Sequence, residues 1–436
     1  MTLKILHLSD IHFYSFGENE HLDLDDDLRN ELESDLRQLM SNTQPVDVLL
    51  IGGDIGFSGK KEEYEKASLW IREICSITGC KEENVLMVPG NHDIKRSSIS
   101  PLLRRSQEIL KKAISQNEIN KEVNVFLSDK SAYNLLTAPF EDYLNFAQKY
   151  GSIPQDKYLY WEKDFPIENI TLRVRGINSA FASNETDDEK YSKLALSQYQ
   201  TLLKREDNII YLILCHHPPQ WLCDGEDVDR AFCARANIHL YGHMHDCKLS
   251  FENNVLKVYA GAVHPERNNG EWKPTYNILE IENIPANNYL GIKVWIREWD
   301  SIQMKFIPHE ENGFDYKSHR IEIQSNKSSH VATMDTPEDN SLQNNVEEII
   351  EMIDTKKFNP KRKLAYMYLS LPYHMQVEIA TNLDLIEDTD KGLSDSEKIQ
   401  NYFSRAFEQE KQAEMWDLIK KMKPEIVTDI NPYKEK

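Results

Sequence analysis

NVLMVPGNHD, residues 84–93, joins an apolar run typical of a buried strand to the polar turn residues GNHD. The same kind of join occurs twice upstream, in LKILHLSDIH (3–12) and in VDVLLIGGD (46–54). Ligands of α/β proteins bind in the crevice beyond the carboxyl ends of the strands. The three joins therefore predict strands that deliver their polar residues to one common crevice.

Two downstream stretches, IIYLILCHHP (209–218) and IHLYGHMH (238–245), end in the same way. Each motif alone has an ordinary explanation, because GNHD is a common turn sequence and single histidines are often surface or core residues. Five such motifs, each following a strand, favour a functional site. Alternate side chains of an extended segment point to one side, so we expect D-x-H and H-x-H to direct both residues into one cavity.

The residue types in these motifs indicate a transition-metal site. Imidazole nitrogen combined with carboxylate oxygen suits manganese, iron, zinc or nickel rather than calcium. A glycine precedes Asp54, Asn91 and His243, and glycine lets the backbone and a ligand approach each other closely.

The order of the elements predicts an α/β fold with layered sheets. Residues 24–40 and 61–77 carry apolar residues at helical spacing between the early strands. Three late runs, 276–281, 291–299 and 304–308, have no helix between them and predict a largely antiparallel second sheet. The remaining strand-like runs are 172–177, 209–215, 238–242 and 256–262.

Three regions depart from this rhythm. Residues 95–165 look helical and irregular, and we interpret them as an insertion into the first domain, 1–325, lying over or beside the site. Residues 326–345 are polar and aperiodic, which predicts a linker. Residues 346–436 return to amphipathic helices, one of them opened by the capping sequence SDSE (394–397), and predict a small all-α domain.

The 436-residue chain is acidic, with a formal net charge of -21. Such a surface repels nucleic acid and anionic membrane unless a local positive feature, such as bound metal ions, overrides it.

Six scattered cysteines without a CxxC pair indicate reduced thiols. A zinc–thiolate site among the four cysteines between 215 and 247 is an alternative, although their spacing matches no zinc pattern. The N-terminus is no signal peptide and no apolar run spans a bilayer, so we expect a cytoplasmic protein without membrane association.

In the order D-x-H, GD, GNHD, HHP and GHxH, the five motifs resemble the signature of the calcineurin-like metallophosphoesterase family, over about residues 1–325. The resemblance implies a two-sheet β-sandwich flanked by helices. It also implies hydrolysis of a phosphate ester by a hydroxide that two divalent metal ions activate, with manganese expected first and iron, zinc or nickel as alternatives.

Carried over position by position, the resemblance implies a role for each motif residue. Asp54 would bridge the two metals. His92 would donate a proton or stabilise charge beside the scissile phosphate, Asp93 would orient its ring, and His217 would support the site. The other implied metal ligands are Asp10, His12 and His245 for the first ion, and Asn91, His216 and His243 for the second.

The substrate is less closely defined. The stretches around the first three motifs resemble bacterial members of the family, including cyclic-nucleotide and other phosphodiesterases, while the same core serves DNA-repair nucleases and protein phosphatases. The acidic surface favours a small nucleotide or a short single strand over long DNA. The basic residues that follow GNHD, namely Lys95, Arg96, Arg104 and Arg105, are either a nucleic-acid contact or a solvated helix face.

The tail, about residues 346–425, resembles small helical adaptor domains appended to bacterial conflict and antiphage effectors. That resemblance implies recruitment by a protein partner, or self-association. Two hypotheses follow. The chain is a phosphodiesterase or nuclease in bacterial defence or nucleotide signalling, or it is a binding or scaffold protein that keeps a structural metal cage and acts through its tail.

Overall fold

The computed structural model describes the chain in two parts. The described residues form two compact units, Met1–Ser328 and Ser329–Lys436. The predicted linker, 326–345, and Ser394 of the predicted capping sequence lie outside the described residues, so the exact domain boundary stays a prediction. The described ranges are 2–15, 25–41, 43–154, 158–187, 193–263, 273–285, 289–310, 315–323, 364, 367–368, 371, 373–390, 395–423 and 431–434.

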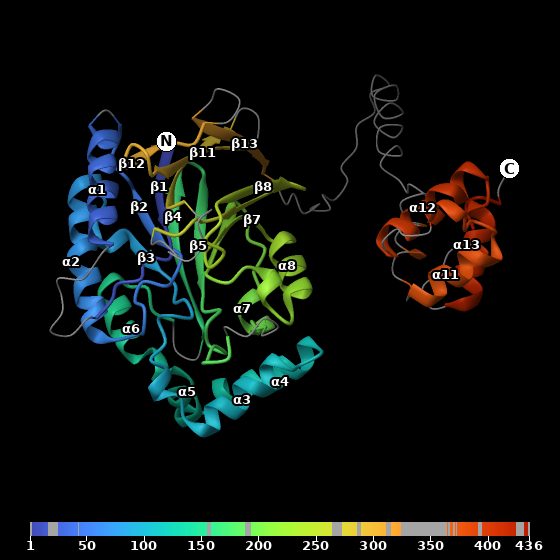
Figure 1. Ribbon diagram of the computed structural model, residues 1–436, viewed down its shortest axis with the longest axis horizontal. Coiled ribbons are helices and arrows are strands. Elements are labelled where there is room, and N and C mark those ends of the chain that lie inside the picture. Colours follow the sequence, from blue (N-terminus) through green and yellow to red (C-terminus); the bar gives the residue numbers. More distant parts are fainter. Residues whose placement is uncertain are drawn as a thin grey trace, which may run out of the picture. The chain divides into compact units, whose positions relative to one another are not determined.

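The first unit contains two mixed sheets with helices outside them, the predicted fold class (Figure 1). The first sheet has the strand order β12-β11-β10-β1-β2-β3, and β13 also pairs with β11. Strands β1, β2 and β3 are parallel, and β10 joins β1 in antiparallel register. The bounds are β1 Thr2–Leu8, β2 Val48–Ile51, β3 Val85–Met87, β10 Thr275–Ile284, β11 Tyr289–Asp300, β12 Lys305–Pro308 and β13 Tyr316–Glu322.

The second sheet has the order β4-β5-β6-β7-β9-β8. Its four central strands, β5, β6, β7 and β9, run parallel, so their carboxyl ends lie at one edge. The bounds are β4 Tyr160–Ile167, β5 Ile170–Ile177, β6 Ile209–Cys215, β7 Ala236–Tyr241, β8 Lys248–Glu252 and β9 Val255–Tyr259.

Helices cover the outer face of each sheet (Figure 1). Helices α1 (Asp26–Met40), α2 (Lys61–Thr78) and α6 (Glu141–Ala147) share a hydrophobic cluster with the first sheet, as the apolar faces of 24–40 and 61–77 predicted. The helices of the second side are α3 Pro101–Lys111, α4 Gln116–Ser128, α5 Lys130–Thr137, α7 Gln198–Thr201 and α8 Gly225–Cys233. Single 3-10 turns occur at Glu82–Asn84, Arg96–Ser98, Ala138–Phe140, Gln148–Tyr150, Pro219–Trp221 and Asp388–Asp390.

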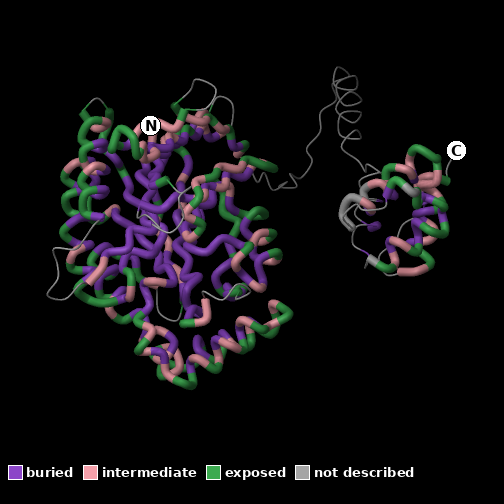
Figure 2. Tube along the Cα trace, in the orientation of Figure 1, coloured by how far each residue is buried: buried purple, intermediate pink, exposed green. Residues whose placement is uncertain are grey.

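Buried apolar residues of both sheets form one cluster between them, and Figure 2 shows the strands of the first unit as largely buried. Ile5 and Leu50 enter this cluster from the first sheet, and Val174 and Leu212 enter it from the second, all fully buried. Strands β2, β3 and β6 are buried on both faces along almost their whole length, so they read as continuous apolar runs in the sequence. This cluster gives the loops at the strand ends a rigid base.

The second unit is helical. Its described helices are α11 (Tyr373–Asn382), α12 (Asp395–Glu408) and α13 (Gln412–Met422). The core forms around Trp416 and includes Ile399 of α12. The predicted all-α character of the tail is therefore confirmed for the described residues.

Two predictions about the sheets are wrong. The late antiparallel strands β10 to β13 extend the first sheet instead of forming a second one, because β10 pairs with the free edge of β1. The stretch 95–165 is helical only as far as Tyr150, and its last residues belong to strand β4. β4 escaped detection because, as an edge strand paired with β5 alone, it alternates polar and apolar residues irregularly.

Candidate metal centre

The loops that follow β1, β2, β3, β6 and β7 meet in one cluster of potential metal ligands. Four groups of three side chains each have ligand atoms within 4.8 Å of one another, and they share members, so they form one continuous cluster. The groups are Asp10–His12–His245, Asp10–Asp54–His216, His12–Asp54–His92 and His216–His217–His243.

Asp54 stands at the middle of this cluster. Its Oδ2 atom lies 3.3 Å from Nε2 of His216 and 3.8 Å from Nε2 of His12. On one side of it, Asp10 Oδ1 lies 3.2 Å from Nε2 of His245. Asp54 and Asp10 are buried, so this charge is held away from bulk water.

Asn91 and His243 lie on the other side of the cluster. Asn91 Oδ1 is 3.1 Å from Nε2 of His217, and the His243 ring is 4.6 Å from the His217 ring and 5.3 Å from the His216 ring, measured between centroids. The structure thus brings the predicted ligand residues of all five motifs together at the edge where the parallel strands end.

The local geometry of D-x-H and H-x-H differs from the extended form that we expected. Asp10 and His12 have φ angles of 55° and 54°, His243 and His245 have 67° and 53°, and Asp54 has 51°. A positive φ is uncommon for residues other than glycine and costs about 1–3 kcal/mol each. The alternation argument is therefore wrong, and the side chains converge because the backbone turns sharply after each strand.

Glycines make the close approach feasible, as predicted. Gly53 has a φ of 104°, and a Cβ added there would lie 2.6 Å from Nδ1 of His216. At Gly90 an added Cβ would lie 2.6 Å from the backbone nitrogen of Asp54. Alanine at either position would push the two halves of the cluster apart.

His92 lies at the edge of the cluster, and Asp93 does not orient its ring. The His92 Nδ1 atom lies 2.9 Å from the carbonyl oxygen of Phe57, and the Phe57 ring stacks on it at 5.0 Å. Asp93 accepts hydrogen bonds from the backbone amides of Gly56 and Gly90, both at 2.9 Å. The predicted role of Asp93 is wrong because its carboxylate joins the second and third loops instead.

The charges in the cluster shift one another strongly. Burial alone would raise the pKa of Asp54, but the imidazoles of His216, His92 and His12 hold it well below its ordinary value. Burial alone would lower the pKa of His216, but Asp54 and Asp10 raise it to about 9. The carboxylates of Asp10 and Asp54 are therefore ionised and buried close together, and a cation bound beside them would be stabilised by their charge.

The donor set fits a bound cation. His216 Nε2 is fully buried and, among the described residues, has no hydrogen-bond partner in suitable geometry, although it faces Asp54. His216 Nδ1 lies 2.8 Å from the carbonyl oxygen of Gly52, which directs the Nε2 lone pair into the cluster. A second hydrogen bond of this kind is typical of histidines that ligate metals.

Ser179 is a residue of the site that sequence reasoning missed. Its hydroxyl lies 2.9 Å from Nδ1 of His217 and accepts a hydrogen bond from the His217 backbone nitrogen at 3.0 Å. Through His217 it holds Asn91. The available signal was its position directly after strand β5, in the sequence INSA (177–180), at the same edge as the five motifs.

A separate group, Asp229, Cys233 and His239, bears on the zinc–thiolate alternative. It contains only one of the four cysteines, and Lys257 Nζ already lies 2.6 Å from Asp229 Oδ1. No group found in the described part of the chain contains two cysteines, so this alternative gains no support.

A four-layer fold with a His/Asp cluster at its strand ends defines a class of metal-dependent phosphoesterases. Residues 3–247 match the calcineurin-like phosphoesterase family, and the chain belongs to it. Residues 360–421 match the GTPase-associated adaptor domain, which confirms the resemblance of the tail to an adaptor domain.

Individual relatives are distant. The chain is 24% identical over 309 residues to the uncharacterized metallophosphoesterase-like protein YydB of Bacillus subtilis (strain 168), covering 65% of this chain and 60% of that protein. It thus spans less than two thirds of the length of this curated relative.

The chain also shows similarity to solved structures. Purple acid phosphatase PPD1 from yellow lupin (Lupinus luteus) seeds is 11% identical, with a TM-score of 0.41 over 76% of this chain and 57% of that one. Chaetomium thermophilum Vps29 is 10% identical, with a TM-score of 0.30 over 74% of this chain and 99% of that one.

The described part of our chain contains no helix that is long and apolar enough to cross a membrane.

Proposed function

We propose that this chain hydrolyses phosphodiesters of nucleotides or nucleic acid at a centre of two divalent metal ions. The observation that carries the proposal is the position of Asp54, whose carboxylate faces His12 on one side and His216 on the other. A carboxylate between two sets of nitrogen and oxygen donors suits a bridge between two cations.

The ligand sets in this proposal are those that the resemblance to the family implies. Asp10, His12 and His245 would hold the first ion, and Asn91, His216 and His243 would hold the second. Nitrogen and oxygen donors suit manganese, iron, zinc or nickel, and the resemblance puts manganese first. Two such ions, when bound, would lower the pKa of a water between them and clamp the attacking and leaving oxygens of the phosphate.

His92 is the proton donor in this proposal. The Phe57 carbonyl accepts from Nδ1, so Nδ1 keeps its proton and Nε2 is the nitrogen that can exchange one. The His92 ring lies 4.8 Å from the His12 ring, beside the cluster but outside its buried middle. A histidine in this position can protonate the leaving oxygen.

Apolar side chains at both rims of the cluster favour a nucleoside-bearing substrate. On one rim Phe57 is 39% exposed and stacks on Tyr14 at 4.2 Å. On the other rim Met244 is 37% exposed, and Trp221 meets the His243 ring at 4.3 Å. Exposed aromatic surface beside a phosphate site suits nucleobases, which stack on such rings.

The basic residues after GNHD give little support to long nucleic acid. Lys95 Nζ lies 3.0 Å from Asp142, and Arg104 forms an ion pair with Glu185. Cations already paired in this way contribute weakly to a phosphate backbone contact. A small nucleotide or a short single strand is therefore the favoured substrate.

The adaptor domain supports a partner-directed role. Through the adaptor domain at 360–421, the chain would be recruited by a partner protein or by another copy of itself. Its role would then lie in bacterial antiviral defence or nucleotide signalling. The competing hypothesis is a scaffold protein whose metal cage is structural.

A metal assay combined with a substrate panel separates the two hypotheses. Purified protein should hold about two metal ions per chain. The substrate panel contains cyclic nucleotides, single- and double-stranded DNA, RNA, an aryl diester and a phosphomonoester. With manganese added, the protein should cleave one or more of the diesters in this panel. His92→Ala should lower kcat by roughly 10²- to 10⁴-fold. Metal-loaded protein that cleaves nothing, or whose measured cleavage is unchanged by both Asp54→Asn and His92→Ala, would favour the scaffold.

A further inference from the structure

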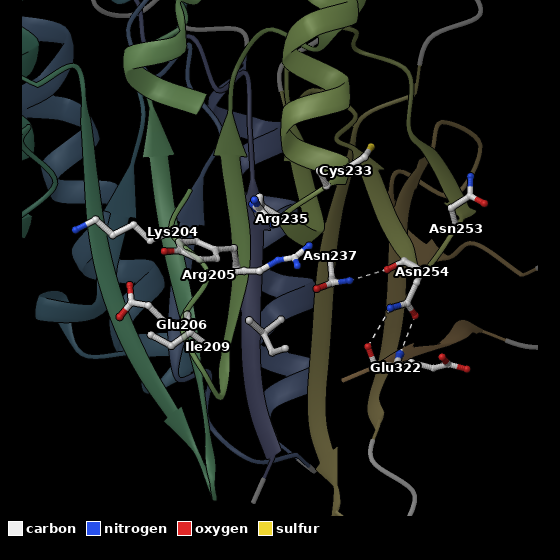
Figure 3. A pocket seen from close by; sticks show the side chains of 13 residues that line it. Lys204, Arg205, Glu206, Ile209, Cys233, Arg235, Asn237, Asn253, Asn254 and Glu322 are labelled. Carbon is white, nitrogen blue, oxygen red and sulfur yellow. Dashed lines mark hydrogen bonds between the residues drawn. The ribbon is translucent and has the colours of Figure 1, made fainter. Parts of the chain in front are cut away.

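A cavity separate from the metal cluster lies where the strands of the second sheet begin, at the opposite ends of the strands from the cluster (Figure 3). It measures about 130 Å³ and is bordered by the residues where β6 and β7 begin. The same two strands end at His216 and His243 in the metal cluster. Since β6 has seven residues, the two sites stand roughly 20 Å apart, one strand length.

Two arginines give this cavity a positive charge. Arg205 precedes β6 and Arg235 precedes β7, and within the described part of the chain neither forms an ion pair or a side-chain hydrogen bond. Figure 3 shows the Arg205 side chain extending toward Asn237. Neighbouring arginines of this sheet behave differently, since Arg173 is paired with Asp164 at 2.7 Å and Arg175 with Glu162 at 2.7 Å.

Within the described part of the chain, the carboxylates at the cavity form no ion pair with Arg205 or Arg235. Glu206 Oε1 lies 2.7 Å from Arg173, so this carboxylate faces a different guanidinium, one that also pairs with Asp164. Glu322 contributes its backbone, and Figure 3 shows its carboxylate pointing away from Arg205. In a chain with a net charge of -21, two like charges left together without a partner indicate a place for an anion.

Amide groups hold the floor of the cavity in place. Asn237 donates from Nδ2 to the carbonyl oxygen of Asn254 at 2.9 Å. Asn254 donates to the carbonyl oxygen of Glu322 at 3.0 Å and accepts from its backbone nitrogen at 2.7 Å. The floor is therefore rigid before any ligand binds, which lowers the cost of binding.

We propose that this cavity is a binding site for a single phosphate group, held by Arg205 and Arg235 and separate from the metal centre. The planar guanidinium fork matches phosphate oxygens in a bidentate way. The volume is below the roughly 300–1,000 Å³ of pockets that enclose a whole small molecule, so it suits one anionic group. That group is inorganic phosphate or the phosphate end of a nucleoside monophosphate.

Calorimetry on the full chain, stripped of metal with a chelator, tests this site independently of hydrolysis. Inorganic phosphate is titrated in one series and 5′-AMP in another, which distinguishes the two sources of the phosphate group. The double variant Arg205→Gln/Arg235→Gln should weaken binding roughly tenfold or more, because it removes the charge-assisted hydrogen bonds.

Arg72→Gln is the control for each of the two substitutions, since it removes one guanidinium of the same kind from an exposed position on α2. It should leave the dissociation constant unchanged, and circular dichroism should show that all variants are folded. Equal phosphate binding by the wild type and the double variant would overturn the site, as would the absence of binding of either ligand to the wild type. Neither result bears on the metal centre.

Discussion

The two units of this protein each contain a buried polar cluster, and the clusters differ in how completely the chain satisfies them. In the helical unit, Asp390 accepts from both terminal nitrogens of Arg405, at 2.6 and 2.9 Å, from Asn401 at 3.1 Å and from the backbone of Glu387 at 2.8 Å. In the first unit, His216 Nε2 has no hydrogen-bond partner in suitable geometry among the described residues, although Asp54 Oδ2 lies 3.3 Å away.

We interpret this difference as the one between a structural cluster and a candidate functional one. A buried polar network that is fully satisfied stabilises a single fold, whereas an incomplete one is costly and needs a reason. Asp10 and Asp54 also have left-handed backbone angles, which adds strain at the same place. The incomplete cluster is the one that a metal and a phosphate would complete.

The sharpest test of the contrast is Asp54→Asn. Loss of the shared carboxylate should reduce diester hydrolysis roughly a thousandfold, because both metal positions depend on it. Initial rates with an aryl diester and manganese would measure the effect. Circular dichroism should show an intact fold; hydrolysis at the wild-type rate would remove Asp54 from the centre.

Ser179→Ala should have the next largest effect. Its hydroxyl orients His217 and thereby Asn91, and loss of such a supporting hydrogen bond typically costs 10- to 100-fold in metal affinity or activity. Metal titration followed by activity measurement would show a higher metal requirement. Ser68→Ala is the control, because that buried hydroxyl lies in helix α2, where it donates to the Tyr64 carbonyl at 2.8 Å.

Asp390→Asn tests the satisfied cluster. The ion pair with Arg405 lowers the pKa of Asp390, so its stabilising effect is complete above the ordinary carboxyl pKa of about 3.9 and is lost as the pH falls below it. The substitution should lower the free energy of unfolding of the helical unit by about 1–3 kcal/mol at pH 7. Urea unfolding at pH 7 and pH 3 would measure this, and the variant should differ less from wild type at pH 3.

Removal of residues 330–436 should have the smallest effect on chemistry. The described site residues all lie in the first unit, so hydrolysis of a small diester should stay within about twofold of the full chain. Association or partner binding should change instead. A large loss of hydrolysis by a folded first unit would mean that the helical unit completes the site, and the contrast between the units would fail.

The sequence predicted strands such as β2, β3 and β6 correctly, because they are apolar runs buried on both faces. It missed β4, β8 and β13, which lie toward the sheet margins and carry mixed residues. It also assigned β10 to the wrong sheet, since a strand's own residues do not indicate which edge it joins.

By itself, the sequence determined the chemistry of the site: five motifs of histidine, aspartate and asparagine, each placed after a strand. Only the tertiary structure decided how those residues meet, through left-handed turns after the strands and not through extended alternation. It also showed that Asp93 joins two loops, that Ser179 supports His217, and that Arg205 and Arg235 share a cavity. Side-chain type is local information, whereas contacts between residues distant in sequence depend on packing of the whole chain.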